Sequence, residues 1–144
     1  MRSPFFSIDS CYGANQLVEV EIRNFGGFPL DFTSDSMNVQ VNVSGTTTQT
    51  LNFTVKDNSL NGGNLLRVGD VLKVPVGSTN MTNIGTYNFE AIVELVGDTF
   101  TINDTSRMSV TVQPYTGGML SGIDTICFGD TVSLSVSGYI GGLQ

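Results

Sequence analysis

The clearest structural signal in this chain is the run Tyr87-Asn88-Phe89-Glu90-Ala91-Ile92-Val93-Glu94-Leu95. Every second residue from Tyr87 to Leu95 is apolar, and Asn88, Glu90 and Glu94 stand between them. Alternation with a period of two places one set of side chains on a buried face of a strand and the other set toward solvent. We therefore predict a long β-strand here, with Phe89 in the core.

The same alternation on both sides of this stretch predicts further strands. Their expected core positions are Phe5, Phe6 and Ile8; Val18, Val20 and Ile22; Met37, Val39, Val41 and Val43; Leu51, Phe53 and Val55; Leu72, Val74 and Val76; and Met108, Val110 and Val112. Apolar residues at helical spacing are not found, so the chain is expected to be all-β. Pro75 cannot donate to a strand ladder, which predicts that its strand lies at a sheet edge.

About seven short strands over roughly 110 residues are typical of an immunoglobulin-like or fibronectin type III-like β-sandwich. The run from Asn83 to Tyr87 agrees with a tyrosine corner, in which a tyrosine hydroxyl is tied to nearby backbone. Alternatively, Tyr87 is an ordinary core aromatic. Phe89 takes the place of the second cysteine of an antibody domain, and the chain has no Trp, so we do not expect the antibody core pair.

A short internal repeat suggests a tandem organisation. Ile8-Asp9-Ser10-Cys11-Tyr12-Gly13 recurs as Ile123-Asp124-Thr125-Ile126-Cys127-Phe128-Gly129, and a predicted strand follows each copy. Self-similarity of this kind is typical of modules in series. We therefore predict a complete β-sandwich over residues 1–115, a linker over 116–121 and the incomplete start of a second module over 122–144, as in an internal piece of a longer polypeptide.

The repeat also determines how the two cysteines are interpreted. Equivalent positions in successive modules lie about one module length apart, beyond the ~7 Å between Cα atoms that a disulfide can bridge. We therefore expect Cys11 and Cys127 not to be bonded to each other. Each either pairs with a cysteine elsewhere or remains a thiol, and a small buried residue at the start of a strand is the plainest account of both.

Composition limits the partners and the compartment. The net charge of −7 repels nucleic acid and anionic membrane surfaces. Only 13% of the residues are charged, which is typical of secreted β-proteins. No apolar stretch approaches the ~18 residues of a membrane span. We predict an extracellular or cell-surface protein without membrane insertion, whose export signal lies outside this chain.

Catalysis is not expected. The chain has no His, which excludes a Ser-His-Asp triad, a Cys-His dyad and a His-ligated zinc site. Carboxylate pairs could support glycoside hydrolysis. However, the alternation places Glu19, Glu21, Glu90 and Glu94 on solvent-facing strand positions without a cleft.

Two loops hold candidate Ca²⁺ ligands, because carboxylate and amide oxygens are the donors that this ion prefers. One loop contains Asp57 and Asn58, and the other contains Asp98, Asn103 and Asp104. Neither loop matches an EF-hand, and Asx-rich turns also form for purely conformational reasons. No other cofactor is expected. Support for a sugar site is weak, since few Tyr residues lie outside the predicted core.

The chain resembles Ig-like repeat modules of large secreted adhesins of the Bacteroidota. In that family, modules often open with Cys-x-Gly-x-x-Val-x-Leu, as in the run from Cys127 to Leu134, and often carry a Gly-Asp…Asn-Asp loop, as in residues 97–104. The resemblance implies export by the type IX system and a role in surface attachment, gliding or as a stalk. Cys11-Tyr12-Gly13 fits the opening motif less closely.

Taken together, the sequence predicts a non-catalytic extracellular module that acts as a spacer or adhesive repeat. Its expected partners are neighbouring modules of the same chain and a surface glycan or protein. The alternative is an accessory Ca²⁺- or carbohydrate-binding module of a secreted enzyme. If both acidic loops lie at the same end of the sandwich, that arrangement favours the alternative.

Overall fold

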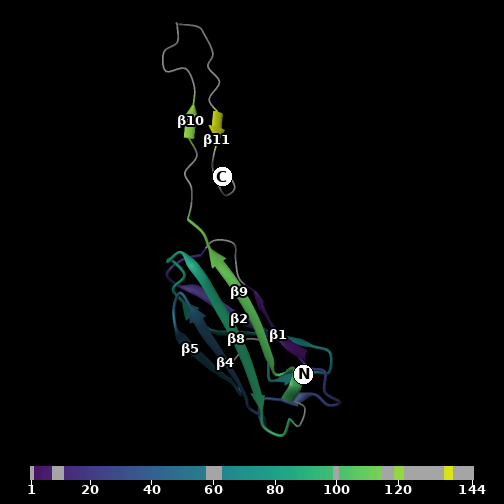
Figure 1. Ribbon diagram of the computed structural model, residues 1–144. Coiled ribbons are helices and arrows are strands. Elements are labelled where there is room, and N and C mark those ends of the chain that lie inside the picture. Colours follow the sequence, from purple (N-terminus) through teal and green to yellow (C-terminus); the bar gives the residue numbers. More distant parts are fainter. Residues whose placement is uncertain are drawn as a thin grey trace, which may run out of the picture. The chain divides into compact units, whose positions relative to one another are not determined.

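The computed structural model describes residues 2–7, 12–57, 63–98, 101–114, 119–121 and 135–137. In these residues every regular element is a β-strand except one short 3₁₀ helix, η1 (Thr101–Asn103) (Figure 1). The chain is therefore all-β, as the alternation predicted. It divides into two compact units, Met1–Val112 and Gln113–Gln144.

The first sheet of unit 1 is antiparallel and has the order β1-β2-β7. Its strands are β1 (Arg2–Ser7), β2 (Gln16–Arg23) and β7 (Val71–Thr79). Pro75 lies on β7, at the edge of this sheet, as predicted. The register between β2 and β7 shifts next to Glu19, which pairs with Pro75.

The second sheet is also antiparallel and has the order β5-β4-β8-β9. Its strands are β4 (Met37–Gly45), β5 (Gln49–Val55), β8 (Gly85–Leu95) and β9 (Thr105–Val112). Strand β8 contains the alternating run from Tyr87 to Leu95. Its Phe89 pairs with Val43 on one side and Met108 on the other.

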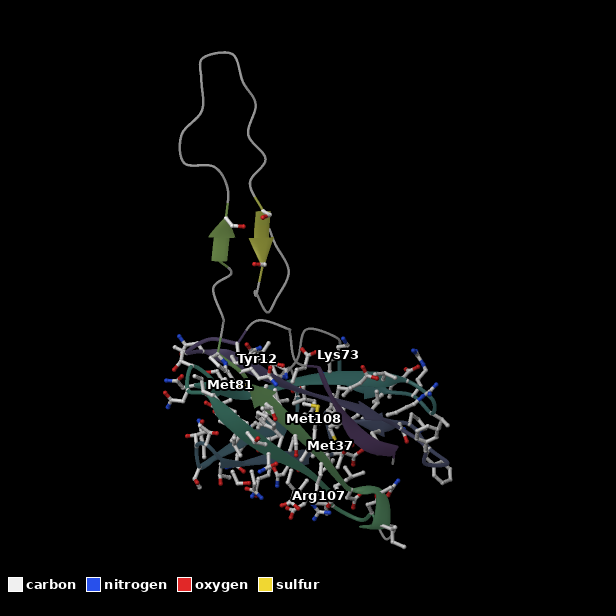
Figure 2. All side chains as sticks on the ribbon, turned by 45° about the horizontal axis from the view of Figure 1, so that its top comes forward. Tyr12, Met37, Lys73, Met81, Arg107 and Met108 are labelled. Carbon is white, nitrogen blue, oxygen red and sulfur yellow. The ribbon has the colours of Figure 1, made fainter. Side chains whose placement is uncertain are left out.

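The core lies between these two open sheets, which is consistent with a β-sandwich. Alternate side chains of β2, β4 and β8 are buried, including Val20, Val41 and Phe89. Figure 2 shows Met37 and Met81 between the layers, and both are fully buried. Lys73 and Arg107 lie on opposite outer faces in the same view. On these three strands the period of two in the sequence therefore marks the buried face correctly. The predicted core residues Phe53, Leu72, Met108, Val110 and Val112 are only partly buried. Ile8 and the side chains of Phe5 and Phe6 lie outside the described part of the structure.

Unit 1 also contains a small third sheet that was not predicted from the sequence. It pairs β3 (Leu30–Asp31) with β6 (Leu65–Leu66). Strands of two residues are too short to show any alternation, so the sequence pattern could not reveal them. The pair buries Leu66 and the adjacent Phe32.

The chain enters and leaves unit 1 at opposite ends. Arg2 of β1 pairs with Arg23 at the end of β2, whereas Val112 of β9 pairs with Gly85 at the start of β8. Figure 1 shows β9 running away from the end at which β1 begins. We call the Arg23 end the entry end and the Gly85 end the exit end.

Unit 2 contains a two-stranded antiparallel sheet formed by β10 (Met119–Ser121) and β11 (Ser135–Ser137). The division between units falls after Val112, and Met119–Ser121 forms a strand within the segment expected to be linker. The backbone of Met119–Ser121 pairs with Ser135–Ser137. In the described parts of the chain, no helix has the length and apolar character needed to cross a membrane.

Candidate functional site

The loop between β8 and β9 holds the candidate ligands Asp98, Asn103 and Asp104. After β8 ends at Leu95, a tight turn forms in which the Asp98 amide donates to the Leu95 carbonyl at 3.1 Å. Gly97 supports this turn with a positive φ of 89°, a conformation that suits glycine. Farther along the loop, the Asp104 carbonyl accepts a hydrogen bond from the Val93 amide at 2.9 Å.

Two side-chain oxygens in this loop are buried without a partner. They are Asn103 Oδ1 and Asp104 Oδ1, for which the described residues supply no hydrogen-bond donor. An unsatisfied buried acceptor costs about 1–3 kcal/mol, and more when it is charged. The loop therefore carries two oxygens that a ligand would stabilise.

The charge at this loop is also unfavourable. Burial raises the pKa of the Asp104 carboxyl, and repulsion from Asp98 raises it further. A bound cation would relieve this repulsion, and the unpartnered oxygens are of the kind that a hard ion such as Ca²⁺ prefers. Two carboxylates and one amide oxygen do not complete its usual 6–8 ligands, and backbone carbonyls and water would supply the rest. No cluster of three or more Asp, Glu, Cys or His side chains suited to a metal occurs among the described residues.

The other predicted loop is arranged differently. Asp57 Oδ1 accepts a hydrogen bond from Asn64 Nδ2 at 2.7 Å, so this carboxylate is used within the protein. Asn58 lies outside the described residues. Both loops lie at the entry end, because Met37 at the start of β4 pairs with Val55 on one side and Leu95 on the other. The structure brings the loops to the same end but does not describe one shared site.

The predicted structural residues fall in two groups. Tyr87 is fully buried, and its hydroxyl donates to the Asn83 carbonyl at 2.9 Å, the hydrogen bond expected of a tyrosine corner. Phe89 is 1% exposed in the centre of the second sheet. Cys11 and Cys127 lie outside the described residues, and their bonding stays a prediction.

An apolar groove at the entry end was not identified from the sequence. It has a volume of about 370 Å³ and lies between the β2–β3 loop and the turn after β8. Its apolar lining consists of Phe25, Phe28, Leu30, Leu95 and Val96. The sequence feature that could have revealed the groove is the pair Phe25 and Phe28, which lie in a Gly-rich turn outside the alternating strands.

Asn24 fixes the shape of this groove. This residue is 3% exposed, and its side-chain amide donates to the carbonyls of Phe28 and Leu66 at 2.9 and 3.0 Å. Its Oδ1 accepts from the Gly26 amide at 2.8 Å. A buried Asn with its polar atoms paired ties the loop to strand β6, so the exposed phenylalanines are presented on a defined backbone.

A hollow lies beside one of the strand glutamates, Glu90, where the alternation of the sequence implied no cleft. This hollow of about 330 Å³ lies on the outer face of the second sheet and is lined in part by Asn42, Glu90 and Arg107. Hydrogen bonds from Arg107 and Asn42 lower the pKa of Glu90. The alternation in the sequence predicted that Glu90 points outward. It did not reveal that Glu90, Arg107 and Asn42 cluster across neighbouring strands.

Comparisons with protein-family models, with curated proteins and with solved structures gave no match to this chain. The fold and the geometry described above therefore carry the functional argument.

Proposed function

We propose that this chain is a non-catalytic extracellular module of a multi-domain bacterial surface protein, in which it acts as a spacer or adhesive repeat. The observation that carries the proposal is that the chain enters unit 1 at one end and leaves it at the other. A module of this kind adds its own length to a series. Strand β8 has 11 residues, which at about 3.3 Å per residue correspond to about 35 Å for each module.

The strand order supports an Ig-like assignment within this proposal. The orders β1-β2-β7 and β5-β4-β8-β9 correspond to A-B-E and C′-C-F-G of Ig-like sandwiches, with no counterpart of strand D among the described residues. The hydrogen bond of Tyr87 to Asn83 stands at the start of the strand that corresponds to F. Both features agree with the resemblance to secreted adhesin modules, from which surface location and type IX export are inferred.

The absence of catalysis in this proposal rests on chemistry. The chain has no His. Glu90, the strand carboxylate that lines the hollow, accepts a hydrogen bond from Arg107 Nε at 2.9 Å, and this hydrogen bond lowers its pKa. An ionised carboxylate paired with Arg is a poor proton donor, which leaves the hollow without a general acid.

Small-angle X-ray scattering tests the spacer role. The maximum dimension of the 1–144 chain would be compared with that of two such chains fused in series. We expect an increase of at least about 35 Å, the length of one sandwich. An increase well below this value, unchanged between low and high salt, would show that successive modules fold back on each other and would contradict the proposal.

A second candidate function is supported by the unpartnered oxygens of Asn103 and Asp104. In this alternative, the chain is an accessory module that binds Ca²⁺ and, through it or beside it, a carbohydrate. The position of both acidic loops at the entry end favours it.

Calcium titration followed by thermal melting decides on this candidate. A ligand that binds only the folded state raises the melting temperature as its concentration exceeds Kd. We expect a rise with Ca²⁺ that chelator reverses and that Asp104→Asn abolishes. Asp57→Asn is the matched control, because Asp57 is already paired with Asn64. Equal melting curves with Ca²⁺ and with chelator would reject the ion site.

A further inference from the structure

The second sheet ends on one side in strand β5 (Gln49–Val55), which pairs with β4 and has no further neighbour among the described strands. Figure 1 shows β5 at the outer margin of this sheet. Its register with β4 is continuous from Gln49 to Val55. A regular edge strand presents a row of backbone N–H and C=O groups that can pair with another strand.

The other edge strands of the two large sheets carry features that hinder such pairing. Strand β1 contains Pro4 and β7 contains Pro75, and the register of each with β2 is irregular. Strand β9 carries the exposed Arg107. Proline, irregular register and charge are means by which natural sheets avoid pairing at their edges. Strand β5 has none of the three, so among these described edges it is the best suited to pairing.

The sequence of β5 identifies the partner strand, because its side chains have nearly the same order in both directions. The run Thr50-Leu51-Asn52-Phe53-Thr54 is hydroxyl, apolar, amide, apolar and hydroxyl in turn. Two copies that pair antiparallel about a two-fold axis at Asn52 place Thr opposite Thr, Leu opposite Phe and Asn opposite Asn. Thr–Thr pairs stabilise a sheet, and each face of the joined sheet keeps the polarity that it has in one chain.

Phe53 gives this pairing an apolar contribution. It is only partly buried, whereas Leu51 and Val55 on the same face of β5 are buried. A second strand beside β5 would bring Leu51 of the other copy next to Phe53 and remove more apolar surface from water, which is favourable. The core of the sandwich thus reaches the open edge at this residue.

Asn52 lies at the centre of the opposite face of β5. It is exposed and stands opposite Gln40 of β4. An Asn side chain has both donors and an acceptor, so two Asn side chains that face each other can exchange two hydrogen bonds. The two-fold axis therefore passes through a residue that can pair with itself.

The distribution of charge permits a second copy at this edge. The chain has a net charge of −7, but residues 46–55 contain no Asp, Glu, Lys or Arg. In the two-fold register, Lys56 and Asp57 fall opposite Thr48 and Thr47 of the other copy, so like charges do not face each other. The general repulsion between two acidic chains is screened by salt, so the association should strengthen as salt is added.

We propose that two copies of this chain associate by antiparallel pairing of their β5 strands about a two-fold axis at Asn52, which joins their second sheets into one. Strand β5 runs from the exit end to the entry end. The two modules therefore point in opposite directions, as in a contact between chains that extend from two facing surfaces. This inference deepens the adhesive role proposed above and rests on it for that setting.

Sedimentation velocity of the 1–144 chain at micromolar to millimolar concentrations tests the pairing. We expect a monomer–dimer equilibrium that shifts toward the dimer as salt is added. Asn52→Lys places like charges opposite each other at the axis and should weaken the dimer by about tenfold or more. Thr111→Lys is the matched control, because Thr111 is exposed on β9, the other edge strand of the same sheet, and it should not weaken the dimer.

A mixture of two variants tests the register. Asn52→Glu alone should weaken the dimer as Asn52→Lys does. An equimolar mixture of the two brings opposite charges together at the axis, so it should form a heterodimer more readily than either variant forms a homodimer. The urea midpoint of each variant should match that of the original chain, because residue 52 is exposed. The scattering comparison can be repeated with Asn52→Lys in each fused chain, so the spacer role and the pairing can fail separately.

Three results would overturn the inference. The first is a chain that stays monomeric at millimolar concentration in physiological salt. The second is a dimer that Asn52→Lys does not weaken, or that Thr111→Lys weakens equally, because another surface would then hold the copies together. The third is a mixture of the Lys and Glu variants that forms no more dimer than either variant alone, which would refute the two-fold register at Asn52.

Discussion

Replacing Phe89 with Ala provides the most direct test of the core. Phe89 is 1% exposed and lies on β8, between Val43 of β4 and Met108 of β9. Truncating a buried Phe removes its transfer free energy and leaves a cavity, which together cost about 3–5 kcal/mol. The free energy of unfolding of an ordinary domain is about 5–15 kcal/mol. This substitution should therefore remove a large part of the stability of unit 1.

Two other phenylalanines provide the controls for the same substitution. Phe53 is partly buried on the edge strand β5, and Phe28 is 82% exposed. Phe28→Ala should change the free energy of unfolding by no more than about 0.5 kcal/mol, because surface changes away from special features are small. Phe53→Ala should fall between Phe28→Ala and Phe89→Ala.

Urea unfolding at pH 7, together with thermal melting, measures this series. At about 4 °C per kcal/mol for a unit of this size, Phe89→Ala should lower the melting temperature by about 12–20 °C. The denaturant slope should not change, because the surface exposed on unfolding is nearly the same. If Phe89→Ala cost no more than Phe28→Ala, the strand register and the position of the core would both be refuted.

The remaining predictions concern single polar groups. Tyr87→Phe should lower the free energy of unfolding by about 1 kcal/mol, because the Asn83 carbonyl loses its donor; an unchanged urea midpoint would contradict this. Asp104 has a pKa raised above 3.8, so the folded state retains a proton that the unfolded state releases, and its contribution to stability falls as pH rises above about 3.8. Asp104→Asn should therefore raise the melting temperature at pH 7 in chelator but not at pH 3, and a pH-independent difference would argue against the raised pKa. Asn24→Ala should cost about 2–4 kcal/mol through three lost hydrogen bonds and shift the Gly26 amide in NMR spectra; a native spectrum would show that Asn24 does not hold the loop.

Most of the fold followed from local pattern. Residues such as Val39 and Val41 on β4 reveal their buried face in the sequence, because a strand between two layers alternates along its whole length. Pro75 revealed the edge of the first sheet for a local reason, its missing donor. The β3–β6 pair was missed, because its Leu30 and Leu66 contacts depend on pairing across the chain and not on any periodic run.

The candidate site was predictable only in part. Composition singled out Asp98 and Asp104 as ion ligands, but their mutual repulsion and the unpartnered oxygen depend on how the loop folds. Asn24 looked like an ordinary turn residue, and its buried hydrogen bonds reach Leu66, which is distant in the sequence. The groove could not be predicted, because it is assembled from two loops whose proximity is set by the two sheets.

The two ends of unit 1 differ in chemistry, and this difference gives the module a direction. Arg23, Asp57, Asp98 and Asp104 lie toward the entry end, together with the apolar groove. The described segments at the exit end are residues 12–16, 46–49, 79–86 and 111–114. These segments contain no Asp, Glu, Lys or Arg.

Among the described residues, this end therefore carries no charge that would have to be buried against a neighbouring module, a cost that is high when charges are unpaired. Val112, the last residue of unit 1, lies at this end, where it pairs with Gly85. The groove and the acidic loop are thereby kept at the other end of the sandwich, about 35 Å away along β8. In the proposed spacer, the acidic loop and the end at which the chain leaves unit 1 are therefore separate surfaces, and we expect Asp104→Asn to change ion binding without changing the length that a second fused chain adds.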